Sequence, residues 1–406
     1  MTQRLFRHRL LVTAVIAVIA CGAASQVAAQ SAQERAEQRR SARAQKQEPE
    51  QPVKAVDQYP LATRTAPEAK ATAKVTPKLK KMMELYDADK GAEARAIADE
   101  IIANPAANDY DHAFAAQIAA QIAYDADDSA SAVAYLNRVV EFNGLDNNAH
   151  FGAMLMQGQL LLQDENYAGA LVSLDRFLAE SKSDKPEHLV LKGNALYRLE
   201  RFPEAAAVLK QAITASPAPK ADWQQLLMAT YLESGQSADA AKLAEGLAKG
   251  NPNDKRAQMN VVAVYLQGDM YDKAAAVLEQ LRSAGQLTED NDYRQLYSAY
   301  LNMEGKEKQA TGVIEDGIAK GVLKPDFQTY LALAQSYYFS DQVGPSIDAY
   351  KKAAPLAPDG EAYLNLARVL WQEDRIPEAK EAAKQAIAKG VKKPDDAKKI
   401  IALPSK

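Results

Sequence analysis

A small residue recurs through most of this 406-residue chain at a nearly constant interval. The positions are Ala94, Ala132, Ala170, Ala205, Ala240, Ala274, Ala310, Ser346 and Ala379. Successive positions lie 33 to 38 residues apart, with helical periodicity between them. Intervals near 34 residues are typical of repeats in which two antiparallel helices pack on the next pair. The pattern predicts an all-α solenoid of about nine helix-turn-helix repeats, whose outer repeats act as caps.

The clearest repeat runs from Pro186 to Pro217. Counted from Pro186, its landmarks are Leu189 fourth, Gly193 eighth, Leu196 eleventh, Phe202 seventeenth, Ala205 twentieth, Leu209 twenty-fourth, Ala212 twenty-seventh and Pro217 thirty-second. Gly193 and Ala205 are small enough for two helices to approach closely, and Pro217 cannot continue the second helix. The pattern resembles the tetratricopeptide repeat (TPR), except that Lys192 stands where the family has leucine. That resemblance implies a right-handed solenoid.

The resemblance covers roughly residues 77–395 and is weakest in the first, second and seventh repeats, where Glu100, Asn137 or Gly317 interrupts the pattern. A shorter motif, Ile-Ala-Lys-Gly-Val followed by Lys-Pro-Asp, occurs at residues 318–326 and again at 387–395. Its glycine suits a left-handed helix C-cap, and its aspartate, Asp326 or Asp395, is expected to cap the next helix. A last helix should then begin at Asp395 or Asp396 and cover the final repeat.

The N-terminus has the pattern of a secretory signal over residues 1–29. Three arginines precede an apolar core at residues 10–20, and Val27-Ala28-Ala29 forms a small-residue cleavage site before Gln30. The apolar core is shorter than the roughly 20 residues that span a bilayer, so we expect no transmembrane helix in the mature chain. Residues 30–75 are basic and rich in Gln, Ala, Arg and Pro, which predicts a disordered spacer before the solenoid at 76–406.

Cys21 is the only cysteine and lies at the end of the apolar core. We expect it to be removed with the signal, which makes the protein periplasmic and free of disulfides. The alternative is lipidation, because Val18-Ile19-Ala20-Cys21 loosely resembles a lipobox. Membrane contact is expected only in that case, as a lipoprotein anchored at a membrane and facing the periplasm.

The charge distribution argues against nucleic-acid binding. The formal net charge is −4, and residues 30–81 carry twelve Lys and Arg against six Asp and Glu. Without that stretch and the signal arginines the remainder carries −13. A nucleic-acid binder would place basic residues on its folded surface, and here they gather in the spacer instead.

The sequence offers no recognisable catalytic, metal or cofactor site. His112, His150 and His188 are spaced 38 residues apart, but equivalent places in stacked repeats lie about 8–10 Å apart, whereas zinc needs nitrogen at about 2 Å. We therefore expect solvent-facing histidines at the starts of the first helices. The carboxylate pair Asp127-Asp128 suits a turn or cap, and no glycine-rich phosphate loop is present. The chain is predicted not to be an enzyme and to need no cofactor.

The family resemblance points instead to a concave face lined by the first helix of each repeat. The places that line it predict a groove for a protein or peptide partner, formed by Gln159, Gln163, Asn194, Tyr197, Arg198, Gln225, Asn260, Gln335, Tyr338, Asn365, Arg368 and Trp371. Amides can hydrogen-bond an extended backbone, and aromatic rings add contact area at low entropic cost. The clustered Lys and Asn of chaperone-tail grooves are absent.

Two stretches suggest a context for such a scaffold. Asp57-Gln58-Tyr59-Pro60 with Ala62-Thr63-Arg64, and the Lys-Gly-Val-x-Lys-Pro-Asp turns, resemble periplasmic TPR proteins that accompany TonB–ExbB–ExbD-type systems of Gram-negative bacteria. The alternatives are an accessory factor for exopolysaccharide export or outer-membrane assembly, and an envelope hydrolase with an unrecognised site.

Overall fold

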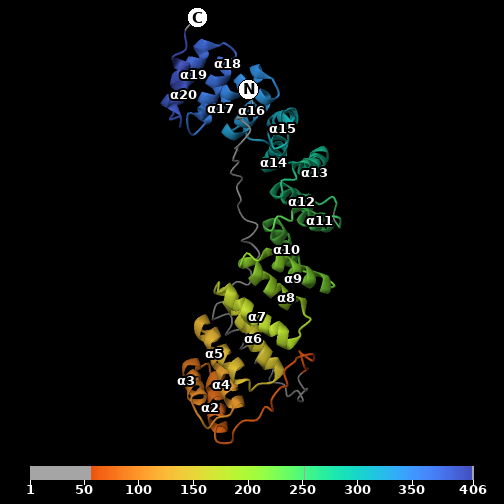
Figure 1. The fold of residues 1–406 in the computed structure, drawn as a ribbon, viewed down its shortest axis with the longest axis vertical. Helices are drawn as coiled ribbons and strands as arrows, with labels where there is room; N and C mark the ends of the chain where they lie inside the picture. The colour runs from red at the N-terminus through yellow and green to blue at the C-terminus, as the bar shows by residue number, and fades with distance from the viewer. Residues whose placement is uncertain (1–55, 251, 405–406) are drawn as a thin grey trace. The chain divides into compact units, whose positions relative to one another are not determined.

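The computed structural model describes residues 56–250 and 252–404, and over these residues it contains nineteen helices and no strand. The predicted signal and Cys21 lie outside the described residues. The chain divides into two compact units at Ser234–Gly235. Within each unit the helices follow one another in chain order (Figure 1).

The first unit contains α2 to α10. Their bounds are α2 Thr76–Asp87, α3 Gly91–Ile102, α4 Asp109–Asp125, α5 Ser129–Phe142, α6 Asn147–Gln163, α7 Tyr167–Ser181, α8 Pro186–Arg198, α9 Phe202–Ala215 and α10 Ala221–Glu233. Each even-numbered helix and the odd-numbered helix after it form one repeat, in which we call them the first and second helix.

The second unit contains α11 to α20. Their bounds are α11 Ser237–Ala248, α12 Lys255–Gln267, α13 Tyr271–Ser283, α14 Asp290–Leu301, α15 Glu307–Ala319, α16 Phe327–Phe339, α17 Val343–Leu356, α18 Glu361–Gln372, α19 Ile376–Ala388 and α20 Pro394–Ile401. Over residues 56–250 and 252–404 this makes nine successive helix pairs and one terminal helix, as the sequence predicted.

Eight of the nine recurring small residues lie on the second helix of a pair that packs together within one unit, and Ala240 lies on α11, the first helix of the second unit. All nine are fully buried, and the hydroxyl of Ser346 donates a 2.8 Å hydrogen bond to the carbonyl of Ala334. The same lack of space explains the glycine of the clearest repeat. A Cβ on Gly193 would stand 2.6 Å from the Leu209 side chain of the second helix. The size restriction inferred from the sequence is therefore confirmed.

A left-handed residue ends the turn inside every repeat. These residues are Asp89, Asp127, Glu165, Glu200, Gly235, Asp269, Gly305, Asp341 and Asp374, with φ between 56° and 76°. Aspartate tolerates this conformation better than most residues and glycine adopts it freely, whereas glutamate has no such preference. The short turn with one left-handed residue allows the chain to reverse within a few residues.

Successive repeats of the second unit are joined by tyrosine–glutamate hydrogen bonds. Tyr265 donates to Glu245 at 2.6 Å, Tyr300 donates to Glu279 at 3.0 Å, and Tyr337 donates to Glu315. In each case the tyrosine lies on a first helix and the glutamate on the second helix of the preceding repeat. Burial, together with the bond to the carboxylate, raises the pKa of Tyr300 and Tyr337 to about 12.

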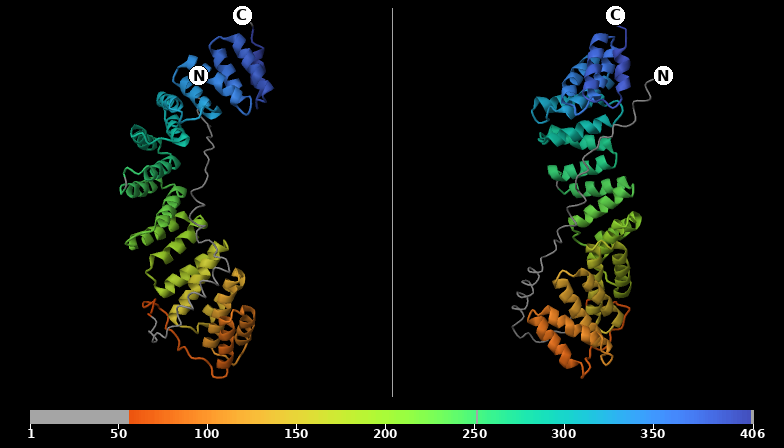
Figure 2. Two further views of the ribbon diagram at one scale, coloured as in Figure 1. Left: turned by 180° about the vertical axis from the view of Figure 1, so that it is seen from behind. Right: turned by 90° about the vertical axis from the view of Figure 1, so that its left-hand side faces the viewer.

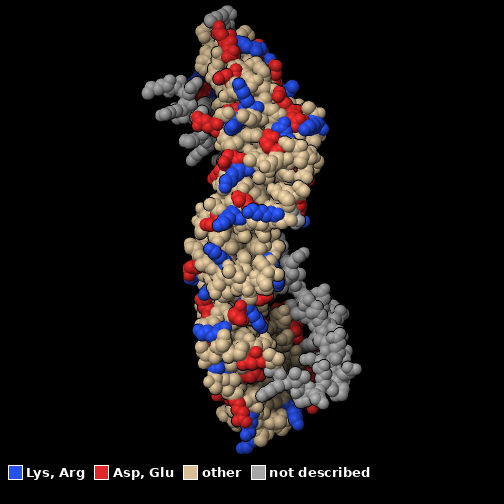
Figure 3. All heavy atoms as spheres, turned by 90° about the vertical axis from the view of Figure 1, so that its right-hand side faces the viewer, with Lys and Arg blue, Asp and Glu red and all other residues tan. Residues whose placement is uncertain are grey.

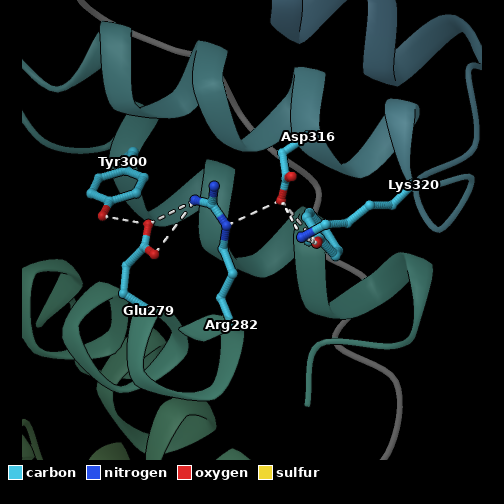
Figure 4. A network of polar contacts seen from close by, with 6 residues as sticks. Glu279, Arg282, Tyr300, Asp316 and Lys320 are labelled. Carbon is cyan, nitrogen blue, oxygen red and sulfur yellow. Dashed lines mark hydrogen bonds and ion pairs between the residues drawn. The ribbon is translucent and has the colours of Figure 1, made fainter. Parts of the chain in front are cut away.

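One of these bonds belongs to a larger network across α13, α14 and α15 (Figure 4). Arg282 donates to Glu279 at 3.1 Å and to Asp316 at 3.2 Å. Asp316 also accepts from Lys320 at 2.9 Å. The network ties two successive second helices to the first helix between them, so its charged groups are used within the fold.

The extended segment 56–75 packs against the repeats of the first unit, and Figure 2 shows it in red and orange. Tyr59 is 4% exposed and lies edge-on to Phe151 and Phe177. Arg64 donates to Asn147 at 2.8 Å and to the carbonyl of Leu145 at 2.7 Å. The prediction of a disordered spacer over 30–75 is therefore wrong for residues 56–75, because aromatic burial and these hydrogen bonds hold them. Residues 30–55 lie outside the described residues. We call residues 56–64 the strap.

The C-terminal motif behaves largely as predicted. Gly321 and Gly390 are left-handed, with φ of 69° and 79°, and Asp326 caps α16 by accepting from the amide of Thr329. The last helix, α20, packs on α18 and α19. The expectation for Asp395 is wrong, because α20 begins one residue earlier, at Pro394, and Asp395 lies in its first turn.

Candidate partner-binding surface

Every residue predicted to line the groove lies on a first helix. In the first unit these are Gln159 and Gln163 on α6, Asn194, Tyr197 and Arg198 on α8, and Gln225 on α10. In the second unit they are Asn260 on α12, Gln335 and Tyr338 on α16, and Asn365, Arg368 and Trp371 on α18. All of them are exposed or half-buried. Six of the first helices therefore present amide side chains that are exposed or half-buried, with aromatic rings beside them on α8, α16 and α18.

In the first unit the surface around α8 is already partly ordered. The guanidinium of Arg198 lies 5.1 Å from the ring centre of Tyr167, and its Nε donates to the Tyr167 hydroxyl at 3.1 Å. Tyr197 packs edge-on against Phe202, with ring centres 5.6 Å apart. Arg198 is exposed and its remaining N–H groups can still donate to a partner, while its position is fixed by the tyrosine.

In the second unit three predicted residues make contacts within the chain. Arg368 donates to Asn365 at 3.2 Å and to Asp396 of α20 at 2.9 Å. Those bonds hold the terminal helix against α18, which gives Arg368 a structural role. The Tyr338 hydroxyl donates to Gln372 at 2.8 Å, and Trp371 beside it is 46% exposed. The exposed ring of Trp371 therefore offers apolar contact area to a partner at this end of the second unit.

The expectation of solvent-facing histidines is wrong for two of the three. His150 is 1% exposed and His188 is 7% exposed, because both rings pack against the phenylalanines of the Tyr59 cluster. His188 shares a 2.7 Å hydrogen bond with the hydroxyl of Ser183. Neither ring nitrogen of His150 has a hydrogen-bond partner. Burial is the main cause that lowers the pKa of His150 to about 4, and the positive charge of Arg64 lowers it further.

Metal-ligating side chains do not cluster in the part of the chain that the structure describes. Among residues 56–250 and 252–404 no group of three His, Cys, Asp or Glu side chains could hold a metal ion. On the face drawn in Figure 3, basic and acidic side chains are interspersed, and neither sign forms a large continuous area. None of the described helices is both long and apolar enough to cross a membrane.

Sequence reasoning missed a hollow of about 360 Å³ between α2 and α4, which we call the first-repeat hollow. Its apolar wall consists of Leu79, Met83, Tyr110 and Phe114, and its rim carries the exposed residues Lys80, Glu84 and Asp87. The rings of Tyr110 and Phe114 stack at 5.9 Å with 12° between their planes. The α2 residues recur every three or four positions, so they share one helix face. That spacing was the available signal, but this repeat fits the family pattern poorly.

Models of the tetratricopeptide repeat match the chain over residues 155–218 and 230–287, and a second model of the same repeat matches residues 360–388. With these matches the described chain is an all-α, TPR-like solenoid, as the sequence predicted. No curated protein matches the sequence.

Solved structures of other proteins are similar to parts of the chain. A tetratricopeptide repeat protein from Parabacteroides merdae ATCC 43184 is 15% identical, covers 63% of this chain and 98% of its own, and has a TM-score of 0.38. A structure of MamA is 20% identical, with 40% and 94% covered and a TM-score of 0.35. MamA MSR-1 is 22% identical, with 42% and 95% covered and a TM-score of 0.33.

Proposed function

We propose that this protein is a non-catalytic scaffold that binds a protein or peptide partner on the faces of its first helices. The observation that carries the proposal is the recurrence of exposed or half-buried amide side chains at equivalent places, as at Gln159, Asn194 and Gln335. Regularly spaced amides suit the backbone of an extended segment, and the rings beside them suit its side chains. Tetratricopeptide repeats in the chain agree with an interaction role.

We place the scaffold in the periplasm of a Gram-negative cell, because the N-terminus has the charge and apolar pattern of a secretory signal. Cleavage before Gln30 would release it, and lipidation of Cys21 would anchor it. Intact-mass analysis separates these outcomes, because a diacylglyceryl-modified Cys21 at the N-terminus contradicts cleavage at Gln30.

The resemblance of residues 57–64 and of the two Lys-Pro-Asp turns supports a partner within a TonB-type envelope transport system. A role in exopolysaccharide export or outer-membrane assembly is the alternative that the same compartment allows. A hydrolase is the least supported candidate, since no group of three metal-ligating side chains was found among the described residues and the ring of His188, which bonds Ser183, is only 7% exposed.

The test is capture of the partner from crosslinked envelope fractions, with the double variant Asn194→Ala/Arg198→Ala against the unaltered protein. These two side chains lie one turn apart on α8. A matched control is Lys210→Ala/Gln211→Ala, which removes one cation and one amide from exposed places on α9 of the same repeat. Both variants should keep the thermal midpoint nearly unchanged, because exposed substitutions usually alter stability by about 0.5 kcal/mol or less.

We expect the α8 variant to lose most of the captured partner and the α9 variant to retain it. Capture should also weaken with added salt, because exposed charges are screened over about 8–10 Å at physiological ionic strength. Full capture by the α8 variant, or equal loss in both variants, would refute binding on the first helices.

A further inference from the structure

The strap is bound to the third repeat as an extended segment with one buried ring. Asn148, near the start of α6, accepts from the amide of Gln58 at 2.8 Å and donates to the carbonyl of Val56 at 2.9 Å. Tyr59 then packs edge-on against rings of α6 and α7. These contacts lie within residues 56–64, so the strap is a discrete attachment.

The strap is joined to the first helices by an exposed hinge. Residues 65–69, which follow it, are all exposed. Beyond them Asn108, the N-cap of α4, donates to the carbonyl of Lys70 at 2.8 Å, and the amide of Thr72 donates to Asp111 at 3.2 Å. Those bonds anchor the far end of the connection on the second repeat. The strap can therefore leave the third repeat while the helices before it stay in place.

His150 belongs to the same attachment. It lies one turn after Asn147, whose side chain accepts from Arg64 of the strap at 2.8 Å. Its ring is edge-on to that of Phe151, with ring centres 5.4 Å apart. The ring is 1% exposed and neither nitrogen has a hydrogen-bond partner. A proton on this ring would place an unpaired charge inside the packed repeat, which is costly.

The charges around His150 come from the strap and from α6, α7 and α8. Arg64 of the strap and Arg176 of α7 disfavour a proton on the ring, and Glu180 of α7 favours it. The carbonyl of Glu180 also accepts from the amide of Thr63 at 2.9 Å. Three further charged residues lie near the attachment and act on Arg64 or on His188: Asp146, Lys185 and Glu187. A proton on His150 therefore faces a cation carried by the strap itself.

We propose that acid releases the strap: protonation of His150 and detachment of residues 56–64 from α6 and α7 favour each other, while the repeats stay folded. The attached strap excludes the proton, whereas detachment brings water to the ring, so falling pH favours the open state. The release does not depend on which partner the scaffold binds.

The size of the effect follows from the two states of His150. Burial, with the charge of Arg64, lowers its pKa from 6.5 to about 4 when the strap is attached. If the ring regains the ordinary value on opening, the ratio of open to attached strap rises at most about 20-fold between pH 7 and pH 5. The same linkage requires that opening the strap by other means raises the pKa of His150.

The first test is a nitroxide label on Leu61→Cys, in a chain in which Cys21→Ser removes the one native cysteine. Leu61 is 70% exposed, so the label displaces no packed side chain. Electron paramagnetic resonance measures the mobile fraction of the label, and circular dichroism measures helix content. We expect the ratio of mobile to immobile label to rise about ten- to 20-fold between pH 7 and pH 5. Helix content should stay unchanged, and its loss in step with label mobility would overturn the proposal.

Two histidine variants separate this release from a general response to acid. His150→Leu removes the titrating group and should lose most of the rise in label mobility. His112→Leu is the matched control, because His112 occupies the equivalent place in the preceding repeat and its ring is half-buried. The control should keep the rise in full. An equal rise in His150→Leu and in the unaltered protein would overturn the proposal.

The reciprocal test needs no label. Tyr59→Ala removes the buried ring of the strap and keeps the charge of Arg64. In this variant the midpoint of His150, measured by nuclear magnetic resonance, should rise from about 4 by about one pH unit or more. Tyr59→Phe keeps the ring and should keep the low midpoint. An unchanged midpoint in Tyr59→Ala would overturn the proposal, because the strap would then not be what excludes the proton.

Discussion

His150 should make the first unit sensitive to acid. Its ring is 1% exposed and neither nitrogen has a hydrogen-bond partner, so a proton on it would create a buried charge. The pKa of His150 falls from an ordinary value of 6.5 to about 4 in the folded protein. One pKa unit corresponds to about 1.4 kcal/mol. On going from pH 7 to below pH 4, His150 alone should therefore lower the free energy of unfolding by about 3 kcal/mol.

The direction of the effect follows from which state binds the proton. Between pH 6.5 and 4 the unfolded chain takes up a proton at His150 and the folded protein does not, so stability falls as the pH falls. The loss is complete below about pH 4, where both states are protonated. Arg64 of the strap and Arg176 oppose the charge, whereas Glu180 favours it.

The assay is urea unfolding of the unaltered protein and of His150→Leu at pH 7, 5 and 4. Leucine resembles imidazole in volume and no hydrogen bond is lost, so the variant should match the unaltered protein at pH 7 within about 1 kcal/mol. It should also lose the part of the acid dependence that His150 contributes, while the part from His188 remains. Hydrogen exchange should show the strap opening early in acid, at the amide of Thr63 that donates to the Glu180 carbonyl at 2.9 Å.

His188→Leu supplies the contrast. Burial lowers the pKa of His188 as well, but its ring shares a hydrogen bond with Ser183, so this variant should lose stability already at pH 7. A titration of His150 by nuclear magnetic resonance with a midpoint near 6.5 would refute the reasoning. An unchanged acid slope in His150→Leu would do the same.

Two further predictions concern backbone geometry and are checked by urea denaturation. A Cβ on Gly144 would stand 2.1 Å from the backbone oxygen of Asp109, which cannot rotate aside. Gly144→Ala should therefore destabilise by about 3 kcal/mol, whereas Gly152→Ala, with no atom within 4 Å, should stabilise α6 by about 0.5–1 kcal/mol. If Gly144→Ala destabilised the protein less than Gly152→Ala does, the close contact at Gly144 would be contradicted. Glu200 is left-handed at φ 58°, so Glu200→Gly should stabilise by about 0.5–1 kcal/mol, and a loss of stability would show that its side chain matters.

The repeat architecture could be predicted because its cause is local and periodic. A buried crossing tolerates only a small residue, so Ala94 and its eight equivalents mark each repeat in the sequence. The sequence did not reveal why Gly317 departs from the seventh repeat. A Cβ there would meet the ring of Tyr293 at 2.7 Å, so glycine makes room for a tyrosine of another helix. An exception of that kind depends on a residue of a neighbouring helix, which the repeat interval in the sequence does not identify.

The strap and the buried histidines were missed for a related reason. Thr63 bonds a residue 117 positions away, and Arg64 bonds one 83 positions away. A low content of large apolar residues predicted disorder for 30–75, but Tyr59 alone places an aromatic ring in a pocket made by α6 and α7. His150 and His188 begin first helices, where exposure is the usual expectation, and the cluster around Tyr59 buries them instead.

The contacts of the strap also change what its sequence means for function. Asp57 accepts from the amide of Tyr59 at 2.9 Å, Tyr59 fills an aromatic cluster, and Arg64 ties the strap to the start of α6. These strap residues make contacts that hold the strap against α6 and α7, and they would make them whatever partner the protein binds. The resemblance of the strap to periplasmic repeat proteins therefore supports a shared packing of this segment on the repeats more directly than it supports a shared transport system. The partner is better sought through an exposed side chain such as Trp371 at the end of α18, whose ring is 46% exposed.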